Sequence, residues 1–312
     1  AYPDRIAKQR HENLNIYLLS NGKSASLHQT DELFHSRFLV ISDLDARTKD
    51  ATIYKAIEIT QAQIEEHLSD QIHQYDDVSW DDEQQRVKVR RVKSLGAIPL
   101  RETQIMNASN EDVLDVLIEA LEELGLEQLH WSKEAKILRQ RVNFLNQHNM
   151  AFPDFSDAYL LEHLDVWLAP YLNGLSSLRA CQNLDFYNIL LGQMSFEQTQ
   201  TLDRLAPSKL KVASGSHIAI DYSNPDQPIL AVRLQEMFGT KSTPSVLGGK
   251  VKLMIHLLSP ASRPMQVTQD LESFWANTYD EVKKELRGKY KKHYWPDDPL
   301  TAVATSKTKK HM

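Results

Sequence analysis

The first third of the chain alternates short apolar runs with polar turns, a pattern typical of strands rather than helices. These runs are rich in β-branched and aromatic residues, and an Asn-Gly pair at 21–22 favours a tight hairpin turn. Strands are predicted at 15–19, 37–42, 51–59, 74–80 and 85–92. Thr60 and Gln63 form a capping-box pattern that predicts a short helix over 60–68. Five or six short strands with one inserted helix predict an OB-like barrel over residues 1–106.

The middle of the chain, residues 107–205, changes to the 3.6-residue period of amphipathic helices. Serines that can cap a helix N-terminus precede three of the periodic stretches, at Ser109, Ser132 and Ser156. The first of these helices is predicted over 110–124, and Pro170 closes the third. The middle is therefore expected to be a helical region.

The last third returns to strands and then to an amphipathic helix. Strands are predicted at 212–222, 228–234 and 250–258. Asp270 predicts the start of a helix that ends at Gly288, with aromatic side chains on one face and cations on the other. The tail 301–312 is polar and basic, and it is predicted to be disordered.

These patterns together predict an α+β fold class. Its expected parts are an OB-like barrel at 1–106, a helical region at 107–205, a mixed α/β region with a basic terminal helix at 206–300 and a disordered tail at 301–312. Charge is divided unevenly among them. Residues 110–205 carry 15 acidic and 6 basic side chains, whereas residues 281–312 carry 9 basic and 4 acidic ones. With a net charge of −6, any polyanion is expected to be bound locally by the basic segments.

Composition excludes several kinds of site and suggests a compartment. A single cysteine, Cys181, allows neither an intrachain disulfide nor a zinc site built on paired cysteines, and a cytoplasmic location is expected. No apolar run is long enough to span a membrane, and no secretory signal opens the sequence, so no membrane partner is expected. The first residue is Ala1 rather than methionine, which favours a piece of a longer protein.

Nucleotide hydrolysis is not expected from this sequence. The nearest approach to a phosphate-binding loop is 238–242, but Gln235 and Thr240 occupy the positions of the two glycines that a Walker A loop requires. No Asp-Glu-x-His helicase box and no G-x-S-x-G nucleophile turn occur. We therefore expect no catalytic residue, metal or cofactor in this segment, and whether the chain is itself an enzyme stays open.

A metal-dependent nuclease is an unfavoured alternative. Asp221 ends one predicted strand and Glu236 follows the next, which is how some nucleases hold Mg²⁺. The usual E-x-K triplet is missing, so the lysine that orients the base has no counterpart. Packing or domain docking is the favoured role for these acids.

The predicted strand at 85–92 carries a row of cations. Alternation would turn its valines inward and place Arg86, Lys88 and Arg90 together on the outer face. Barrels of the OB type bind single strands along such a face, with cations on the phosphates. The alternative is a solvated face whose charge is balanced by the acidic turn 81–83.

A second basic candidate surface follows the C-terminal helix. Its cations are Lys283, Lys284, Arg287, Lys291 and Lys292. Cations beside aromatic rings suit a polyanion through charge neutralisation and stacking. The alternative is that the cations are solvated while the aromatic residues anchor the chain. The candidate anchors are Phe274, Trp275, Tyr279 and Trp295. Further candidate contacts with nucleic acid are Lys23, Arg37, Lys55 and Arg263.

Two C-terminal stretches are distinctive. Residues 256–275 read His-Leu-Leu-Ser-Pro-Ala-Ser-Arg-Pro-Met-Gln-Val-Thr-Gln-Asp-Leu-Glu-Ser-Phe-Trp, and 292–299 read Lys-His-Tyr-Trp-Pro-Asp-Asp-Pro. Supporting stretches lie at 1–7, 167–170, 214–215, 220–222 and 233–239. Taken together, these stretches resemble the C-terminal region of the HrpB family, bacterial ATP-dependent helicases of the DExH-box class.

The resemblance implies an accessory part of an ATP-dependent RNA helicase whose motor lies outside this chain. Its partners would be single-stranded RNA, or DNA, and the upstream RecA-like, winged-helix and helical domains of the same protein. ATP and Mg²⁺ would bind in the missing motor, and the OB-like part would lie beside the exit of the nucleic-acid channel. The expected role is to guide the strand and to buttress the motor. The alternative from another class is a protein-interaction module that docks through the acidic helices 110–205.

Overall fold

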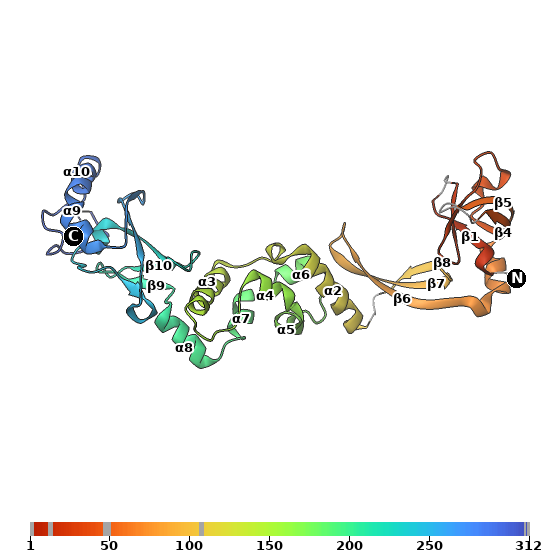
Figure 1. The fold of residues 1–312 in the computed structure, drawn as a ribbon, viewed down its shortest axis with the longest axis horizontal. Coiled ribbons are helices and arrows are strands. Elements are labelled where there is room, and N and C mark those ends of the chain that lie inside the picture. Colours follow the sequence, from red (N-terminus) through yellow and green to blue (C-terminus); the bar gives the residue numbers. More distant parts are fainter. Residues whose placement is uncertain (1–2, 12–14, 46–50, 106–108, 309, 311–312) are drawn as a thin grey trace. The chain divides into compact units, whose positions relative to one another are not determined.

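The computed structural model of the chain describes residues 3–11, 15–45, 51–105, 109–308 and 310. Residues 1–2 of the opening stretch, and 309 and 311–312 of the tail predicted to be disordered, lie outside the described residues. The chain divides into two compact units. The first contains Ala1–Leu121 and Asn173–Ala180, and the second contains Glu122–Leu172 and Cys181–Met312. Figure 1 shows the elements of both.

A five-stranded barrel begins the first unit, in red and orange in Figure 1. Its strands are β1 (Ile6–Gln9), β2 (Ile16–Leu19), β3 (Ser24–Ser26), β4 (Phe38–Asp45) and β5 (Ala51–Glu58). They close in the order β1-β2-β3-β5-β4, because β1 pairs with both β2 and β4. Tyr17 is fully buried inside, and its hydroxyl donates to the Ser36 carbonyl at 3.0 Å. The predicted α+β class with an N-terminal barrel is confirmed.

The barrel is smaller than its predicted extent of 1–106. Strands β6 (Ile72–Asp81), β7 (Arg86–Leu95) and β8 (Ile98–Gln104) form a separate antiparallel sheet. Closure of the five-stranded ring explains this difference, since it leaves no free strand edge for β6–β8 to join. The basic strand β7 is therefore not a barrel strand.

Helix α1 (Gln61–His67) connects the barrel to this sheet. The predicted capping box is confirmed, because the Thr60 side chain accepts from the Gln63 N–H while the Gln63 side chain accepts from the Thr60 N–H. Ile64 of the helix is fully buried in a second apolar core, which also contains Phe38 of β4 and Ile98 of β8. This core holds the barrel, the helix and the sheet together.

Seven helices follow in the middle of the chain. They are α2 (Asn110–Leu124), α3 (Lys133–Gln147), α4 (Asp157–Glu162), α5 (Leu164–Trp167), α6 (Leu178–Gln182), α7 (Phe186–Leu191) and α8 (Phe196–Leu205). The predicted helix over 110–124 is confirmed, and Ser132 and Ser156 cap α3 and α4 as expected. The third predicted helix divides into α4 and α5 at His163, whose backbone lies at φ −124° and ψ 34°.

The second unit ends in a mixed α/β region. Its main sheet consists of β9 (Lys209–Lys211), β10 (His217–Asp221), β11 (Ile229–Arg233), β14 (Met254–Leu258) and β15 (Pro264–Thr268). The strand order is β15-β14-β11-β10-β9, and only the β11–β14 pair is parallel among these described strands. A small pair, β12 (Ser245–Val246) and β13 (Val251–Lys252), precedes β14. The helices α9 (Leu271–Asn277) and α10 (Tyr279–Lys289) follow β15.

Two elements predicted in this region as continuous are interrupted in the structure. The predicted strand 212–222 begins as a turn, because the Val212 N–H donates to the Ser216 carbonyl at 2.9 Å and Gly215 lies at φ 86°. The predicted helix from Asp270 to Gly288 divides at Thr278 into α9 and α10, and α10 continues to Lys289.

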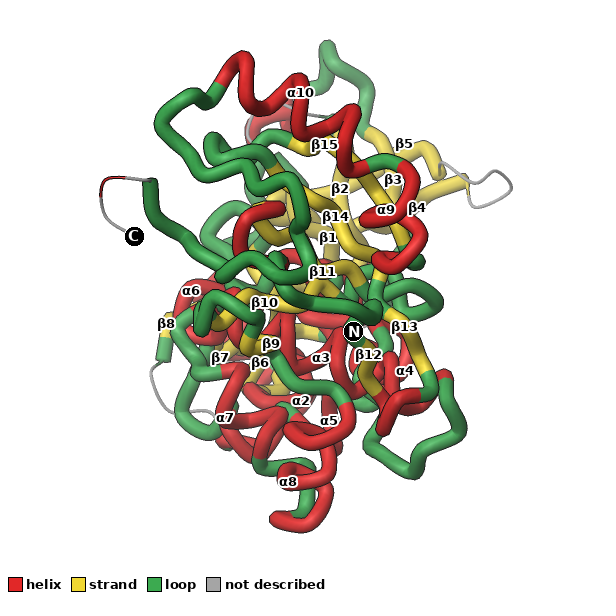
Figure 2. The backbone as a smooth tube through the Cα atoms, turned by 90° about the vertical axis from the view of Figure 1, so that its left-hand side faces the viewer, coloured by secondary structure: helices red, strands yellow, loops and turns green. Residues whose placement is uncertain are grey.

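The aromatic residues after β15 are buried. Phe274, Trp275, Tyr279 and Trp295 are 3%, 7%, 1% and 8% exposed. The Trp275 indole N–H donates to the Thr240 carbonyl at 2.8 Å, and the Tyr279 hydroxyl donates to the Pro296 carbonyl at 2.9 Å. Helices α9 and α10, drawn red in Figure 2, are thereby tied to the loop before β12 and to the segment after α10. In the tail, the Thr305 N–H donates to the Gln235 carbonyl at 3.0 Å.

Burial of this aromatic cluster predicts a large effect of Phe274→Ala. Loss of a buried ring should lower the free energy of unfolding of the C-terminal unit by about 3–5 kcal/mol. Urea unfolding followed by tryptophan fluorescence measures it. Phe196→Ala is the matched control, because Phe196 is 79% exposed and its loss should change stability by less than about 0.5 kcal/mol. Equal effects of the two changes would contradict the anchoring role of the cluster.

Burial of Cys181 predicts an unreactive thiol. The thiol is fully buried, and burial raises its pKa to about 11. Only about one molecule in a thousand would then carry the reactive thiolate at pH 8. Labelling with a disulfide reagent should be very slow in the native chain and fast in urea. Rapid stoichiometric labelling without denaturant would show that the thiol is accessible.

Candidate nucleic-acid interface

The cations of β7 lie between acidic residues of the neighbouring strands. Arg90 is paired in register with Asp77 of β6. Its guanidinium contacts the Asp77 carboxylate at 2.6 Å and the Glu102 carboxylate of β8 at 2.9 Å. Lys88 forms an ion pair with Asp81, at the β6 end of the predicted acidic turn. Two of the three cations predicted to bind phosphate are therefore already neutralised within the sheet.

Ion pairs within this sheet lower the pKa values of two of its carboxyl groups. A hydrogen bond from Lys88 holds the pKa of the Asp81 carboxyl below its usual range, and one from Arg91 does the same for Asp76. Arg86 differs, since it is exposed and has no carboxylate within 4.0 Å among the residues described. The predicted row Arg86–Lys88–Arg90 thus leaves one unpaired cation.

The barrel cations are exposed but scattered. Lys23 lies in the β2–β3 turn, Arg37 immediately before β4, and Lys55 on β5. The Arg37 guanidinium stands 5.6 Å from the Phe38 ring centroid. No ion pair to these three is seen in the part of the chain that the structure describes. They stand on three different elements.

The helix α10 carries both paired and unpaired cations. Lys283 contacts Asp280 at 2.7 Å and Asp297 at 3.3 Å, and Lys289 contacts Glu285 at 2.7 Å. The exposed cations without a carboxylate within 4.0 Å, judged over the described ranges, are Lys284, Arg287, Lys291 and Lys292. The structure therefore brings four unpaired cations together over nine residues at the end of α10. We call these four residues the α10 basic surface.

The aromatic residues near this surface are used for packing. The Tyr290 hydroxyl donates to the Ser259 hydroxyl at 3.3 Å, and Tyr294 meets Phe238 edge to face at 6.4 Å between ring centroids. Both tyrosines are partly buried, and the Trp295 indole N–H donates to the Tyr290 carbonyl at 3.1 Å. Contact with a polyanion at this place would therefore rest on charge rather than on stacking. Arg263, in the β14–β15 turn, is exposed as well.

The nuclease alternative does not fit the geometry. Asp221 pairs with Ile229, at the start of β11, whereas Glu236 follows the end of β11. Four residues of extended strand, about 13 Å, separate the two ends. The Glu236 carboxylate is buried and accepts from the Ser214 hydroxyl at 2.8 Å. Among the described residues no group of three or more His, Cys, Asp or Glu side chains is placed to hold a metal ion.

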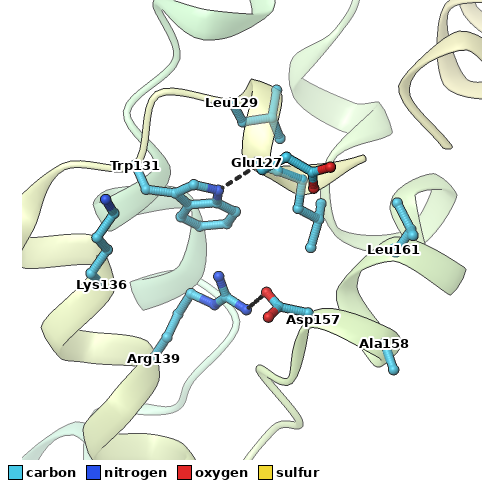
Figure 3. Close-up of a pocket in the computed structure, with 9 residues that line it drawn as sticks. Glu127, Leu129, Trp131, Lys136, Arg139, Asp157, Ala158 and Leu161 are labelled. Atoms are coloured by element: carbon cyan, nitrogen blue, oxygen red, sulfur yellow. Dashed lines mark hydrogen bonds and ion pairs between the residues drawn. The ribbon is translucent and has the colours of Figure 1, made fainter. Parts of the chain in front are cut away.

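The helical region contains a cavity that the sequence did not predict. It has a volume of about 470 Å³ and is lined by residues of η4 (Leu126–Gln128), α3 and α4. Figure 3 shows Trp131 and Arg139 on one side and Glu127 and Leu161 on the other. The Arg139 guanidinium lies 4.6 Å from the Trp131 ring centroid and contacts Asp157 at 2.5 Å. Its lining residues come from η4, the loop that follows it, α3 and α4, so no single local motif predicts it.

The walls of this cavity are chemically mixed. Phe186 lies 4.9 Å from Trp131 between ring centroids, so the indole has both this ring and Arg139 as neighbours. The remaining lining residues are apolar or charged: Leu126, Leu129, Ala158 and Leu161, with Glu127, Lys136 and Asp157.

Comparison with known proteins gives the class. Residues 167–299 match the family described as ATP-dependent helicase C-terminal, HrpB_C. The whole chain is 36% identical to the ATP-dependent RNA helicase HrpB of Escherichia coli strain K12, and it covers 39% of that protein. It therefore spans about two fifths of the length of this curated relative.

Solved structures agree with this result. The crystal structure of the E. coli DExH-box NTPase HrpB matches with a TM-score of 0.62 at 35% identity, over 98% of this chain and 38% of the other. That of the E. coli DEAH/RHA helicase HrpB matches with a TM-score of 0.54 at 33% identity, over 95% and 37%. The chain has the fold of the C-terminal part of an ATP-dependent helicase. It belongs to the HrpB family, whose C-terminal region it matches.

The ion pairs of β7 predict that Arg90 acts mainly within its own sheet. Arg90→Ala should lower the free energy of unfolding by about 0.5–1 kcal/mol, since its pairs with Asp77 and Glu102 are partly exposed and screened. Arg86→Ala, which removes an exposed cation without an ion pair, should change stability less. Urea unfolding of both variants measures the difference. A larger loss for Arg86→Ala would show that the ion pairs do not stabilise the sheet.

Proposed function

We propose that this chain is an accessory part of an ATP-dependent RNA helicase that guides single-stranded nucleic acid. The observation that carries the proposal is the α10 basic surface, where Lys284, Arg287, Lys291 and Lys292 are exposed and unpaired within the described structure. Phosphates release counterions when such cations neutralise them, which gives affinity without sequence preference. A guiding role requires contact of this kind.

The surrounding structure suits this role. The chain leaving α10 is held by Trp295 and by the Tyr279–Pro296 hydrogen bond, so the cations stand on an anchored segment. Anchoring reduces the conformational entropy that binding would otherwise cost. Most other cations that the sequence suggested as ligands are paired with acids or scattered over separate elements.

The motor of the intact protein would lie outside this chain. A relative that is 36% identical over the whole chain is named an ATP-dependent RNA helicase, and this chain covers 39% of it. ATP and Mg²⁺ would bind in that remaining part, together with the RecA-like, winged-helix and helical domains. The present chain would buttress the motor and contact the strand in the cytoplasm. No helix among the described residues is both long and apolar enough to cross a membrane.

A second candidate function is protein docking through the acidic helical region. The cavity beside Trp131 favours it, because its mixed walls would accept an apolar side chain next to a basic group. Residues 110–205 carry 15 acidic and 6 basic side chains, which suits a basic partner peptide. Nucleic acid would be repelled by the same region.

Fluorescence anisotropy with a labelled oligouridylate over a salt series tests the proposed function. The affinity should fall steeply as salt rises. Replacing all four residues of the α10 basic surface by alanine should flatten the slope of log K against log salt by about 2.8, at about 0.7 for each lost contact with a single strand. The wild-type chain should bind at low ionic strength.

Lys289→Ala is the matched control on the same helix, because Glu285 already neutralises this ammonium. Its slope should change by less than that of any single unpaired cation. Absence of binding by the wild-type chain at low salt would overturn the proposed function, and binding of a basic leucine-containing peptide instead would favour the docking alternative. If Lys88→Ala and Arg90→Ala abolished binding while the fourfold variant did not, the contact would lie on β7.

A further inference from the structure

The five-stranded sheet of the C-terminal unit has one packed face and one open face. Alternate residues of its strands are buried, such as Ile220, Leu230 and Ile255 at 2%, 0% and 0% exposure. On the opposite face Ala219 and Ala231 are exposed, whereas Arg233 and His256 are half-buried. Sheets commonly leave one face in water. The exposed alanines at the centre of this one leave a place where a ligand could lie.

Strand register places three basic or titratable residues in a row on the open face. Lys211 pairs directly with His217. Strands β10 and β11 pair at Ile220–Leu230 and Asp221–Ile229. The Ser214 N–H donates to the Glu236 carbonyl at 3.3 Å in the same register, so His217 and Arg233 lie between these contacts on facing segments, without forming a pair themselves. Lys211 and His217 are therefore on neighbouring paired strands, about 4.8 Å apart, and Arg233 lies on the strand beyond them. We call Lys211, His217 and Arg233 the sheet basic row.

A second row runs beside the first and has small residues in its middle. On one side Lys209 pairs with Ala219 of β10, and on the other Ala231 of β11 pairs with His256. Val267 of β15, 49% exposed, pairs with His256 at the other margin. The two alanines leave the backbone open to close approach, while cations stand at the edge.

Basic residues outnumber acidic ones in the five strands of this sheet. Asp221 is the one carboxylate in the five strands. It is the last residue of β10, whereas His217 is the first. In the structure as described, Lys209, Lys211 and Arg233 have no acidic side chain within 4.0 Å. Covering them with a protein surface would cost desolvation free energy unless that surface supplied acids. A polyanion supplies a charge for each cation.

The sheet basic row lies next to the α10 basic surface. Burial, and secondly the positive charge of Arg233, lower the pKa of the His293 imidazole. The His293 ring is also hydrogen-bonded to the Gln235 side chain at 2.9 Å, two residues after Arg233. His293 directly follows Lys291 and Lys292. Arg233, at one end of the sheet basic row, is therefore near His293, which adjoins Lys292 of the α10 basic surface.

We propose that the open face of this sheet binds the phosphate backbone of a single nucleic-acid strand, with the sheet basic row continuing the α10 basic surface. This inference rests on the proposed function and adds to it a second contact surface on β9, β10 and β11. The sheet basic row contacts phosphates, and Ala219 and Ala231 allow the strand to lie close to the sheet. The path between the two surfaces passes His293.

The test uses the whole chain, labelled oligouridylate and a salt series. Lys211→Ala combined with Arg233→Ala should weaken binding several-fold and flatten the salt slope by about 1.4, the value for two lost contacts with a single strand. Ala231→Glu should also weaken binding, because it places a carboxylate in the path. Ala231→Gln has nearly the same size without the charge, so it should bind more tightly than Ala231→Glu.

Lys133→Ala is the control for a general loss of positive charge. Lys133 is exposed at the start of α3 and belongs to neither group of cations. Its variant should bind like the wild type. Melting curves identify variants that fail to fold, and Lys211→Ala alone, with Ala231→Glu, keeps the test decisive if Arg233→Ala unfolds the chain.

Failure of this inference and failure of the proposed function give different results. If the wild type binds and the fourfold α10 variant does not, while the sheet variants bind like the wild type, the sheet contact is overturned and the proposed function stands. If the wild type does not bind at low salt, both fall. If the sheet variants leave RNA binding intact but abolish binding to polyglutamate, the open face takes an acidic protein, and the inference is overturned.

Discussion

The buried side chain and backbone of Gln235 join three distant segments of the C-terminal unit. This residue is 3% exposed in the 3₁₀ turn after β11, and all three of its contacts reach distant segments. Its Oε1 accepts from the His293 Nδ1–H at 2.9 Å, and its Nε2 donates to the Tyr294 carbonyl at 3.2 Å. Its backbone carbonyl accepts from the Thr305 N–H. A buried amide without partners costs about 1–3 kcal/mol, so the sheet, the segment after α10 and the tail are stabilised together.

This constraint decides what the nearby cations and aromatic rings can do. His293 is held against Gln235, so Lys291 and Lys292 stand close to the end of β11 instead of on a free tail. The aromatic residues nearby pack against other side chains, as Tyr294 does against Phe238. What remains at the surface is positive charge on an anchored segment. Binding to such a surface would be sensitive to salt and tolerant of sequence.

Local sequence patterns predicted helices and their caps, but they did not predict which residues pair across strands. The helix at 110–124 and the Thr60 capping box follow from neighbours in sequence, and both are confirmed. The neutralisation of Arg90 does not, because Asp77 and Glu102 lie 13 and 12 residues away and meet it only through strand register. The open sheet face was not predicted for the same reason. Its parallel β11–β14 pair joins two strands that a loop and a small hairpin separate in sequence. The breaks at His163 and Thr278 carry neither glycine nor proline as a signal.

The uneven charge of the chain explains why contact has to be local. The acidic side chains of residues 110–205 offset the basic C-terminal segment, so the net charge of −6 gives a polyanion no general attraction. At physiological salt, charges act over about 8 Å, and a strand would respond to the cations directly beneath it. Neutralised cations such as Lys88 and Lys289 would contribute little, whereas unpaired ones such as Arg287 and Lys211 would each displace a counterion. The pattern of ion pairing, rather than the number of basic residues, therefore defines the path that a strand could follow.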